Sequence, residues 1–323
     1  MRIFVAGAAG AVGRHLVPRL VQSGHVVSGL IHSSAKADLL REFGAEPIVG
    51  DALDGAFVRA AVEAACPDVI VHELTDLKGA ADLRQFERGF ANSNRLRTVG
   101  TDHLLAAARA CNVKRFVAQS FCGWPYSRAG GPVKSEGDPL DPNPPEQQRP
   151  ALDAIRYLER AVAESAAPEG VVLRYGAFYG PDTGLFDGGM IEQIRRRRVP
   201  LIGGGGAWWS FIHIEDVAEA TAVAVERGRG VYNIVDDEPA PVREWLPATA
   251  AMLDAKPPRR IPAWLARLVA GEHLVVMMTE SRAGSNAKAK RELGWRPRHA
   301  SWRDGFAEIF AARARATVGA ARA

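Results

Sequence analysis

Apolar residues in the first half of the chain fall into short runs that are separated by amphipathic stretches. The runs are rich in β-branched residues, which predicts strands over 3–6, 26–31, 47–49, 69–72, 116–120 and 171–174. The stretches between them repeat apolar residues at helical spacing, as in "AVGRHLVPRLVQSG" and "TDHLLAAARACN". Strands that alternate with helices in this way predict right-handed crossovers and a parallel sheet covered on both faces. The predicted fold class is therefore α/β, with a doubly wound sheet.

Glycines and prolines indicate where these elements end. Gly24 and Gly44 each stand just before a predicted strand, where a helix should stop. The segment "DPLDPNPPEQQRP" cannot sustain a helix or a central strand, because proline lacks the amide hydrogen and restricts the residue before it. Residues 123–150 are therefore predicted to form a long loop that leaves the carboxyl end of a strand and overhangs a ligand crevice.

The second half of the chain alternates less regularly. After Gly176 come glycine-rich loops, the strand and helix pattern of "WWSFIHIEDVAEATAVAVERG", then "VYNIVDD" and several short helices. The sequence contains no internal repeat. The alanine- and arginine-rich tail after Phe310 is predicted to be a fraying helix end.

The composition is that of a globular protein without disulfides. The 323 residues are 47% hydrophobic and 24% charged, enough for one large α/β unit or two closely joined domains. Three cysteines (Cys66, Cys111 and Cys122) are too few and too scattered for a disulfide framework or a zinc site, so we expect a reducing compartment and no metal. The first strand leaves no room for a signal segment and no apolar run reaches membrane-spanning length. We expect a cytoplasmic protein.

The charge distribution gives little indication of a macromolecular partner. The net charge is only +4, and the basic run "RRRR" at 195–198 has no aromatic residues among its arginines. A solvated helix end is the simpler interpretation of this run, and a phosphate or nucleic-acid patch is the alternative. The predicted partners are a small-molecule substrate and, in a homodimer, a second copy of the chain, with no nucleic acid and no membrane.

The stretch "VAGAAGAVGRHLV" has the features of a dinucleotide-binding turn. Gly7, Gly10 and Gly13 stand between the first predicted strand and the first predicted helix. Glycine at these positions permits a tight turn, close approach to a pyrophosphate, and close packing of the helix on the sheet. The helix N-terminus, with Ala11 and Val12, offers free amides to the anion. A glycine triplet alone is weak evidence, but here it lies in the required strand-turn-helix context.

The end of the second predicted strand indicates which dinucleotide binds. A site for NAD usually presents an acidic side chain there to hold the ribose 2′-hydroxyl. This chain instead has His32 and Ser33, and no acid before Asp38. A 2′-phosphate would meet no repulsion, and Arg14 and Lys36 are cations that could reach it. NADP(H) is therefore favoured over NAD(H).

Eight motifs span nearly the whole chain: "GAAGAVG", "VGDALD", "VIVHELT", "GTDHLLAAARACNVKRFV", "VLRYGAFYGP", "FIHIEDVAEA", "YNIVDDEP" and "ELGWRPRHASWRDGF". Their order resembles the extended short-chain dehydrogenase/reductase superfamily, of the NAD-dependent epimerase/dehydratase type. The resemblance implies a Rossmann-type domain over 1–178, to which 208–236 return, and a smaller C-terminal substrate domain of 179–207 and 237–323. Together with the local patterns it gives the predicted cofactor contacts Gly7, Gly10, Ala11, Val12, Gly13, Arg14, His32, Ser33, Asp51, Ala52, Leu74, Thr75, Gln119 and Tyr175. Asp51 could bind the adenine amino group or equally cap a helix.

The proton-transfer residues of that superfamily have no counterparts in this sequence. Relatives use a Tyr-xxx-Lys pair on the helix after the fifth strand, a Ser or Thr near that strand's end, and a helper Asn; the tyrosine moves the proton and the lysine lowers its pKa. Matching "ALDAIRYLERAV" through Glu159 puts Ala151 at the tyrosine and Ile155 at the lysine. Matching "RFVAQSFCG" and "RTVGT" puts Phe121 at the serine and Arg97 at the asparagine. None of the four replacements can perform the usual proton transfer.

Other side chains near the strand ends are candidates to replace this machinery. Tyr126 is the first candidate for a proton donor, and Ser120, Gln119 and Cys122 could orient a carbonyl. Packing is the alternative for Tyr126, and a buried, inert thiol is the alternative for Cys122. Tyr157 is the rival donor, but it lies two positions after the lysine-equivalent residue, roughly 200° around the helix, and should face away.

Histidines and aromatic residues complete the candidates. His72 is interpreted as a core histidine, and His213 as a residue that fixes a helix start or a domain junction. Five aromatic residues could form an apolar wall for an aromatic substrate, or could build the domain core instead: Trp208, Trp209, Phe178, Tyr179 and Trp264.

These patterns favour an NAD(P)-dependent oxidoreductase of atypical type. The leading hypothesis is NADPH-dependent reduction of a carbonyl or enone in a small, aromatic metabolite, because hydride transfer is the cofactor's own chemistry and survives a changed proton donor. A sugar-nucleotide epimerase or dehydratase is the first alternative, which the absent Tyr-Lys pair disfavours. A dinucleotide-binding regulator or non-redox enzyme is the second.

Overall fold

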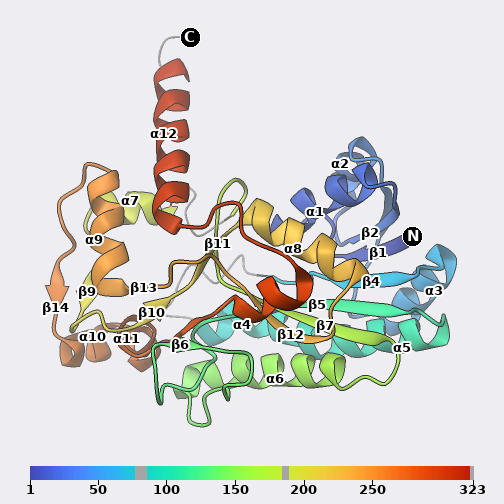
Figure 1. The fold of residues 1–323 in the computed structure, drawn as a ribbon, viewed down its shortest axis with the longest axis horizontal. Helices are drawn as coiled ribbons and strands as arrows, with labels where there is room; N and C mark the ends of the chain where they lie inside the picture. Colours follow the sequence, from blue (N-terminus) through green and yellow to red (C-terminus); the bar gives the residue numbers. More distant parts are fainter. Residues whose placement is uncertain (77–85, 184–188, 321–323) are drawn as a thin grey trace.

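The computed structural model describes residues 1–76, 86–183 and 189–320, and a seven-stranded parallel sheet lies at its centre (Figure 1). The strand order is β12-β7-β5-β4-β1-β2-β3. The strands are β1 (Arg2–Ala6), β2 (Val26–Ile31), β3 (Glu46–Val49), β4 (Val69–His72), β5 (Arg115–Phe121), β7 (Glu169–Tyr175) and β12 (Gly230–Ile234). All six strands predicted in the first part of the chain are present, within two residues of their predicted bounds. The predicted α/β class with a Rossmann-type sheet is confirmed.

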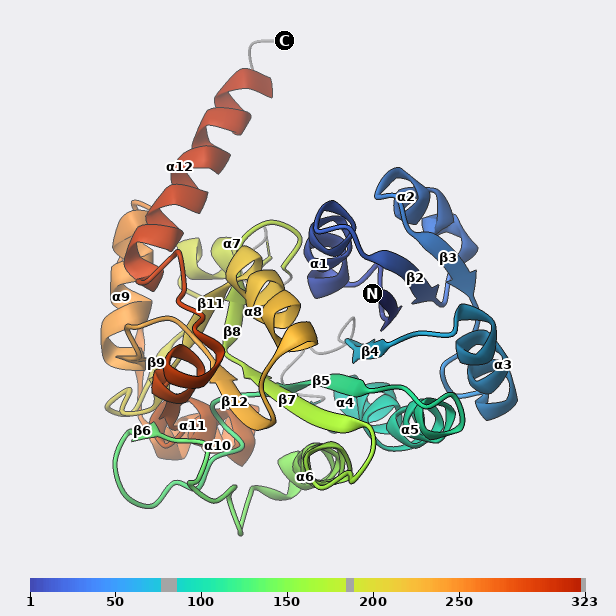
Figure 2. The same cartoon turned by 45° about the vertical axis from the view of Figure 1, so that its right-hand side comes forward.

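Helices cover both faces of the sheet, as Figure 2 shows. Successive side chains of a strand point to opposite faces. Ile3 and Val5 of β1 therefore enter one apolar core, whereas Phe4 and Ala6 enter another. The first core lies under α1 (Ala11–Gln22), α2 (Ala37–Glu42) and α8 (Ile214–Glu226), and the second under α3 (Gly55–Ala65), α5 (Thr101–Ala110) and α6 (Arg149–Ala163). Burial of both faces explains the near-continuous apolar runs of the strands.

The chain order reverses at β1, and this positions the site. From β1 the chain builds outward through β2 and β3 on one side, and through β4 and β5 on the other. In an open parallel sheet a ligand binds outside the carboxyl ends of the strands at such a point. On this path α4 (Phe86–Arg95) and α5 are joined by the π-helical turn η3 (Leu96–Gly100).

A third apolar core is built mainly by residues that follow β7. Short strands pair β8 (Ala177–Tyr179) with β11 (Phe211–His213), β9 (Leu201–Ile202) with β14 (Arg260–Ile261), and β10 (Trp208–Trp209) with β13 (Ala240–Pro241). The helices here are α7 (Gly189–Arg195), α9 (Val242–Met252), α10 (Ala263–Ala270), α11 (Glu272–Thr279) and α12 (Trp302–Ala320), with the π-helical turn η5 (Ala289–Leu293) before α12. Trp302 and Phe306 anchor the start of α12, whose remainder extends away from the body of the molecule (Figure 1).

The punctuation predicted from glycine and proline is confirmed. Gly24 and Gly44 adopt φ angles of +81° and +80° just after α1 and α2 end. Residues 123–150 contain only the short strand β6 (Val133–Lys134), paired with β15 (Ala283–Gly284), and the 3₁₀ turn η4 (Glu146–Gln148) before α6 begins. Within this loop Arg128 pairs with Asp141 at 2.8 Å, and it also pairs with Glu280 outside the loop at 2.9 Å. That the loop overhangs a ligand crevice stays a prediction.

Within the described parts of the chain, no helix combines the length and the apolar character needed to cross a membrane.

Candidate active site

Two glycines of the turn between β1 and α1 leave no room for a side chain. Gly7 has a φ of +93°, and a Cβ on it would lie 2.7 Å from the carbonyl oxygen of Glu73. A Cβ on Gly13 would lie 2.4 Å from the carbonyl oxygen of Ala8. The turn therefore lies against the end of β4, and α1 packs closely on the turn. Both contacts are what a phosphate-binding turn requires.

The start of α1 offers hydrogen-bond donors to an anion. Gly10 precedes the helix without a side-chain cap, and the first turn carries no acidic residue. The first amides of a helix, here those of Ala11, Val12 and Gly13, have no carbonyl partner within the helix. Together with the positive end of the helix dipole, these groups fit the pyrophosphate of a dinucleotide.

Two cations lie together beside this turn, close to the end of β2. The Nζ of Lys36 and the Nε of Arg14 both donate to the carbonyl oxygen of Ala9, at 3.3 and 3.4 Å. Arg14 also forms an ion pair with the exposed Asp182 at 3.4 Å. The two residues that follow β2 are both exposed: His32 and Ser33. This environment has positive charge and no acidic side chain from β2 itself, which fits a ribose phosphate.

Asp51 is not a helix cap. The cap of α3 is Asp54, whose carboxylate accepts hydrogen bonds from the amides of Ala56 and Phe57. Asp51 is exposed, and its Oδ1 accepts a hydrogen bond from the amide of Leu53 at 2.9 Å. The alternative interpretation of Asp51 as a cap is therefore wrong, and its exposed carboxylate leaves the predicted adenine contact open.

The other predicted cofactor residues lie along the same edge of the sheet, because the strands are parallel. Ala52 is buried after β3, Leu74 is half-buried and Thr75 exposed after β4, and Gln119 and Tyr175 are buried near the ends of β5 and β7. The Nε2 of Gln119 has no hydrogen-bond partner in the described part of the chain. The structure thus brings the whole predicted set to one edge.

Aliphatic side chains occupy the positions assigned to the catalytic pair. Ala151 and Ile155 are both buried on α6. Phe121, at the position assigned to the serine, is half-buried at the end of β5. Tyr157 points from α6 toward α5, where its hydroxyl donates to Asp102 at 2.6 Å, so it is turned away from the position of Ile155 as predicted. None of these side chains can supply a proton to this end of the sheet.

Tyr126 lies in the protein interior and is part of a hydrogen-bond network. It is 0% exposed; its hydroxyl donates to Oδ1 of Asn233 at 2.7 Å and accepts from Nη1 of Arg174 at 2.9 Å. Burial raises the pKa of Tyr126 well above its usual value. A proton held this firmly is poorly available to a substrate. The packing alternative therefore replaces the predicted role of Tyr126 as proton donor.

Ser120 and Cys122 are also engaged in the interior. Ser120 Oγ donates to Oε1 of Glu159 at 2.6 Å, and Arg174 grips both oxygens of Glu159 at 2.7 and 2.5 Å. Cys122 packs against Tyr126, and burial raises the pKa of its thiol to about 12. Neither residue is free to orient a substrate carbonyl, which corrects their predicted catalytic roles.

Glu73 is a buried acid that the sequence patterns did not single out. It follows β4, is 5% exposed and accepts a hydrogen bond through Oε1 from the hydroxyl of Tyr175 at 2.8 Å. Its Oε2 has no partner among the residues that the structure places. Burial raises the pKa of Glu73 to about 8. The signal available in the sequence was an acid directly after the apolar run "VIVH".

His72 has a structural role. Its Nδ1 accepts a hydrogen bond from the amide of Leu74 at 3.2 Å, and its Nε2 lies 3.1 Å from the hydroxyl of Thr101. Burial lowers the pKa of His72 to about 4, so the ring is neutral. This confirms the prediction of a core histidine.

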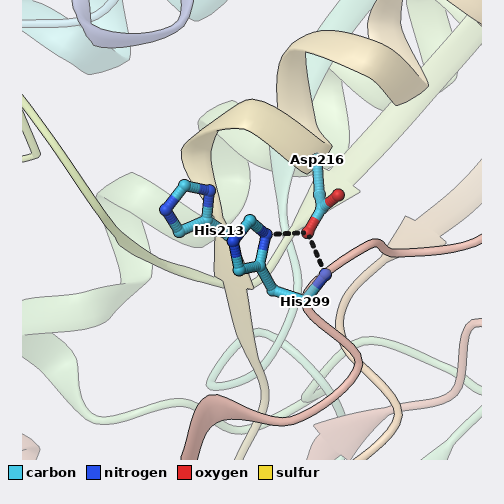
Figure 3. A group of neighbouring side chains, drawn as sticks. All are labelled: His213, Asp216 and His299. Atoms are coloured by element: carbon cyan, nitrogen blue, oxygen red, sulfur yellow. Dashed lines mark hydrogen bonds and ion pairs between the residues drawn. The ribbon is translucent and has the colours of Figure 1, made fainter. Parts of the chain in front are cut away.

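His213 and His299 join α8 to the C-terminal part of the chain (Figure 3). The ring of His213 accepts a hydrogen bond from the amide of Glu215 through Nδ1 at 3.2 Å and stacks on the ring of His299, with centroids 3.8 Å apart. Asp216 accepts hydrogen bonds from the amides of Arg298 and His299 and from Nδ1 of His299. The spacing of this group would suit a metal ion. However, Nδ1 of His213 already accepts a hydrogen bond, so the proton of the neutral ring lies on Nε2. Neither ring nitrogen of His213 then has a free lone pair for a metal ion. The predicted role of His213 at a helix start is confirmed.

The predicted aromatic wall is only partly present. Tyr179 is buried against His213 and Phe306 in the core, and Trp264 is 64% exposed on α10, so neither is available to line the site as expected. Trp208, Trp209 and Phe178 are half-buried. Phe121 and Trp124 were not part of the predicted wall; Phe121 ends β5, Trp124 follows it, and their ring centroids lie 6.3 Å apart. Aromatic rings are thus present at the ends of β5 and β7.

Comparison with known proteins gives a family match and reductases among the relatives. Residues 3–235 match the model of the NAD dependent epimerase/dehydratase family. The chain is 42% identical over 309 residues to the 3-diazoavenalumate denitrifying reductase of a Streptomyces species, which covers 95% of this chain and 99% of that protein. It is 32% identical over 252 residues to the 4-hydroxy-2-methyl-3-oxo-4-farnesyl-3,4-dihydroquinoline-1-oxide ketoreductase of Stigmatella aurantiaca, covering 76% of this chain and 71% of that protein.

Solved structures share the fold. The UDP-glucose 4-epimerase of Thermus thermophilus in complex with NAD superposes with a TM-score of 0.73 at 23% identity, over 95% of this chain and 97% of that one. At this identity the likeness shows a common architecture.

Proposed function

The chain belongs to the NAD dependent epimerase/dehydratase family and is an NAD(P)-dependent oxidoreductase, and from this premise we propose that it reductively removes dinitrogen from an aromatic diazo compound. NADPH is the proposed hydride donor. The observation that carries this proposal is that Ala151 and Ile155, which the resemblance assigns to the positions of the proton-transfer pair, are aliphatic and buried on α6.

The proposed substrate reacts without an enzymatic acid. Hydride addition to a carbonyl leaves an alkoxide, which needs a proton from a positioned acid. An arenediazonium ion carries a positive charge, so hydride bound to its terminal nitrogen gives a neutral aryl diazene. Loss of N₂ breaks the carbon–nitrogen bond, the N–H proton leaves, and the ring carbon gains a proton, so the net products are arene, N₂ and the oxidised dinucleotide. The residues of α6 then need only position the ring, because solvent can take the proton from nitrogen and supply the proton to carbon.

The relatives support this choice. A protein that is 42% identical over almost the full length of both chains is named for a diazo substrate and for denitrifying reduction. The half-buried rings of Phe121, Trp124 and Phe178 at the strand ends favour an aromatic substrate.

Carbonyl or enone reduction is the second candidate. The 32% identity to a ketoreductase favours it, and Glu73 after β4 is a buried acid at this edge of the sheet whose pKa is raised to about 8. Sugar-nucleotide epimerisation needs the Tyr-Lys chemistry at the positions of Ala151 and Ile155, so it is disfavoured.

The dinucleotide is proposed to lie along the carboxyl edge of the sheet. Its pyrophosphate would contact the amides of Ala11, Val12 and Gly13, and its ribose phosphate Arg14 and Lys36. When bound it supplies the hydride. The part of the chain that forms the parallel sheet and its helices is proposed as the cofactor domain, with the predicted bounds 1–178 and 208–236. The part that forms the third apolar core is proposed as the substrate domain, with the predicted bounds 179–207 and 237–323. A homodimer stays a prediction.

Turnover with defined substrates tests the proposal. We expect the protein to oxidise NADPH when 4-carboxybenzenediazonium is added, with one benzoate and one N₂ formed per NADPH, after subtraction of the rate without protein. Gly13→Ala should lose this activity, because its Cβ would collide with Ala8, whereas Gly131→Ala, with open space around it, should keep it.

Other outcomes identify the other functions. Oxidation of NADPH by aromatic ketones or enones alone would support carbonyl reduction. Binding of NADPH without turnover of either substrate class would support a regulator.

A further inference from the structure

Arg97 lies in a specialised segment beside the candidate active site. It belongs to the π-helical turn η3 between α4 and α5, and such turns occur frequently at functional sites. This turn packs against α6, the helix that carries Ala151 and Ile155. Arg97 is also the residue that the sequence motifs place where relatives have the helper asparagine. It is 6% exposed.

The guanidinium of Arg97 has no direct hydrogen-bond partner for two of its nitrogens. Nε and Nη1 are buried and form no hydrogen bond to any residue in the described ranges. The carboxylate whose charge reaches Arg97 is that of Glu159. Glu159 is already occupied, because Arg174 donates to both of its oxygens and Ser120 donates to Oε1. Glu159 is thus paired with Arg174 and forms no ion pair with Arg97, so the positive charge of Arg97 has no counter-ion among the residues that the structure describes.

No other described group near Arg97 supplies the missing negative charge. His72 is neutral, and the charge of Arg97 contributes to lowering its pKa. Glu73 is next in sequence to His72, but its side chain bonds Tyr175 of the core under α1 and α8, on the opposite face of the sheet. Burying a cation without a counter-ion is unfavourable, so the site is complete only when an anion binds.

The pyrophosphate of a dinucleotide does not fit this requirement. The glycine turn directs it to the start of α1, which covers the opposite face of the sheet from η3 and α6. The nicotinamide and its ribose carry no negative charge, because their polar groups are an amide and hydroxyls. The anion should therefore belong to the substrate.

We infer that Arg97 binds a carboxylate of the substrate and positions its aromatic ring at the strand ends. The chain would thereby select aromatic carboxylates. A guanidinium suits this role, because it stays charged and its charge strengthens each hydrogen bond that it donates to a carboxylate. The inference deepens the proposed function and rests on it only for the identity of the group that is reduced.

Binding without turnover tests the inference directly. With the protein saturated with NADP⁺, calorimetry should show that trans-cinnamate binds about tenfold or more tightly than trans-cinnamamide, which has the same shape without the charge. Arg97→Gln should abolish this preference and Arg97→Lys should restore part of it. Arg115→Gln is the matched control: Arg115 is an arginine at the opposite end of β5, paired with Glu169, and its loss should leave the preference unchanged.

Kinetics provide a second readout. For 4-carboxybenzenediazonium, Arg97→Gln should raise KM about tenfold or more and change kcat much less, whereas for the 4-carbamoyl analogue it should change neither. Equal binding of cinnamate and cinnamamide by the wild-type protein would overturn the inference. So would a preserved preference in folded Arg97→Gln, or a loss of NADP⁺ affinity in this variant with the preference intact.

The two proposals fail in different ways. Absence of diazonium turnover together with an Arg97-dependent preference for cinnamate would reject the proposed function and keep this inference. If Arg97→Gln does not fold, the wild-type comparison and Arg97→Lys still decide.

Discussion

The hydroxyl of Tyr126 holds three segments together. Its ring comes from the loop after β5, its acceptor Asn233 from β12 and its donor Arg174 from β7. We predict that Tyr126→Phe lowers the free energy of unfolding by about 1–3 kcal/mol, because it leaves buried polar groups without partners. Turnover of the folded variant should stay within about twofold of wild type. Urea unfolding and NADPH oxidation measure the two effects, and loss of turnover in a folded variant would return Tyr126 to the mechanism.

Glu73 should make stability depend on pH. The folded state raises the pKa of Glu73 from 4.5 to about 8, so it holds this proton more firmly than the unfolded chain does. The stabilisation is complete below about pH 4.5 and is lost as the pH rises through about 8. Within this window we predict that the free energy of unfolding falls by up to about 1.4 kcal/mol per pH unit from this group.

The variant Glu73→Gln isolates this contribution. Its free energy of unfolding should fall less steeply with pH than that of wild type, as measured by urea unfolding between about pH 5 and 8. Asp236, whose pKa burial raises to about 9, adds a slope of the same sign, whereas His72 and His213, whose pKa burial lowers to about 4, add slopes of the opposite sign below about pH 6.5 in both proteins. Parallel curves for wild type and Glu73→Gln would show that Glu73 is ionised in the folded protein.

At the scale of elements, the turn between β1 and α1 and the residues after β2 should set the choice of dinucleotide. Arg14 and Lys36 converge on one carbonyl oxygen there. We predict that Arg14→Ser or Lys36→Ala weakens NADPH binding about tenfold while NADH binding changes little, because only NADPH carries the additional phosphate. Fluorescence titration of both dinucleotides measures this. Equal losses for the two dinucleotides would indicate that the cations serve the pyrophosphate instead.

The elements themselves were largely predictable from local patterns. The inner strands of the sheet bury both faces, so their apolar runs are visible without knowledge of their neighbours, and Gly24 and Gly44 mark the helix ends by their positive φ. The short strand pairs of the C-terminal part were not predictable. Two-residue strands such as β9 and β14 have no periodicity of their own and depend on contacts between distant segments.

The site was less predictable than the fold for the same reason. The glycine turn is a local motif that is visible in sequence, and the contact of Gly13 with Ala8 is local as well. In contrast, the hydrogen-bond partners of Tyr126, Asn233 and Arg174, are distant along the chain. The sequence therefore did not reveal that its hydroxyl is occupied, and Tyr126 was predicted to be a proton donor. The unpaired charge of Arg97 depends on Glu159 being occupied by Arg174, a fact that only the folded chain reveals.

At the scale of the whole molecule, the group His213, Asp216 and His299 fastens the C-terminal segment to the sheet domain (Figure 3). Asp216 is fully buried and accepts three hydrogen bonds from Arg298 and His299. We predict that Asp216→Ala lowers the free energy of unfolding by about 3–5 kcal/mol, because buried donors lose their acceptor. Urea unfolding measures the change; Asp182→Ala, at an exposed ion pair, is the control and should change stability little. A small effect at Asp216 would show that the segment is held by its apolar contacts alone.

The aliphatic residues on α6 have a consequence for the direction of the reaction. Enzymes that interconvert alcohols and ketones use one tyrosine to give a proton in one direction and to take it back in the other. Ala151 and Ile155 can do neither. The proposed reaction does not need a proton carrier for the reverse direction, because N₂ leaves the active site and the reaction is not reversed. A helix with aliphatic side chains at these two positions is therefore sufficient for a catalyst that works in one direction only.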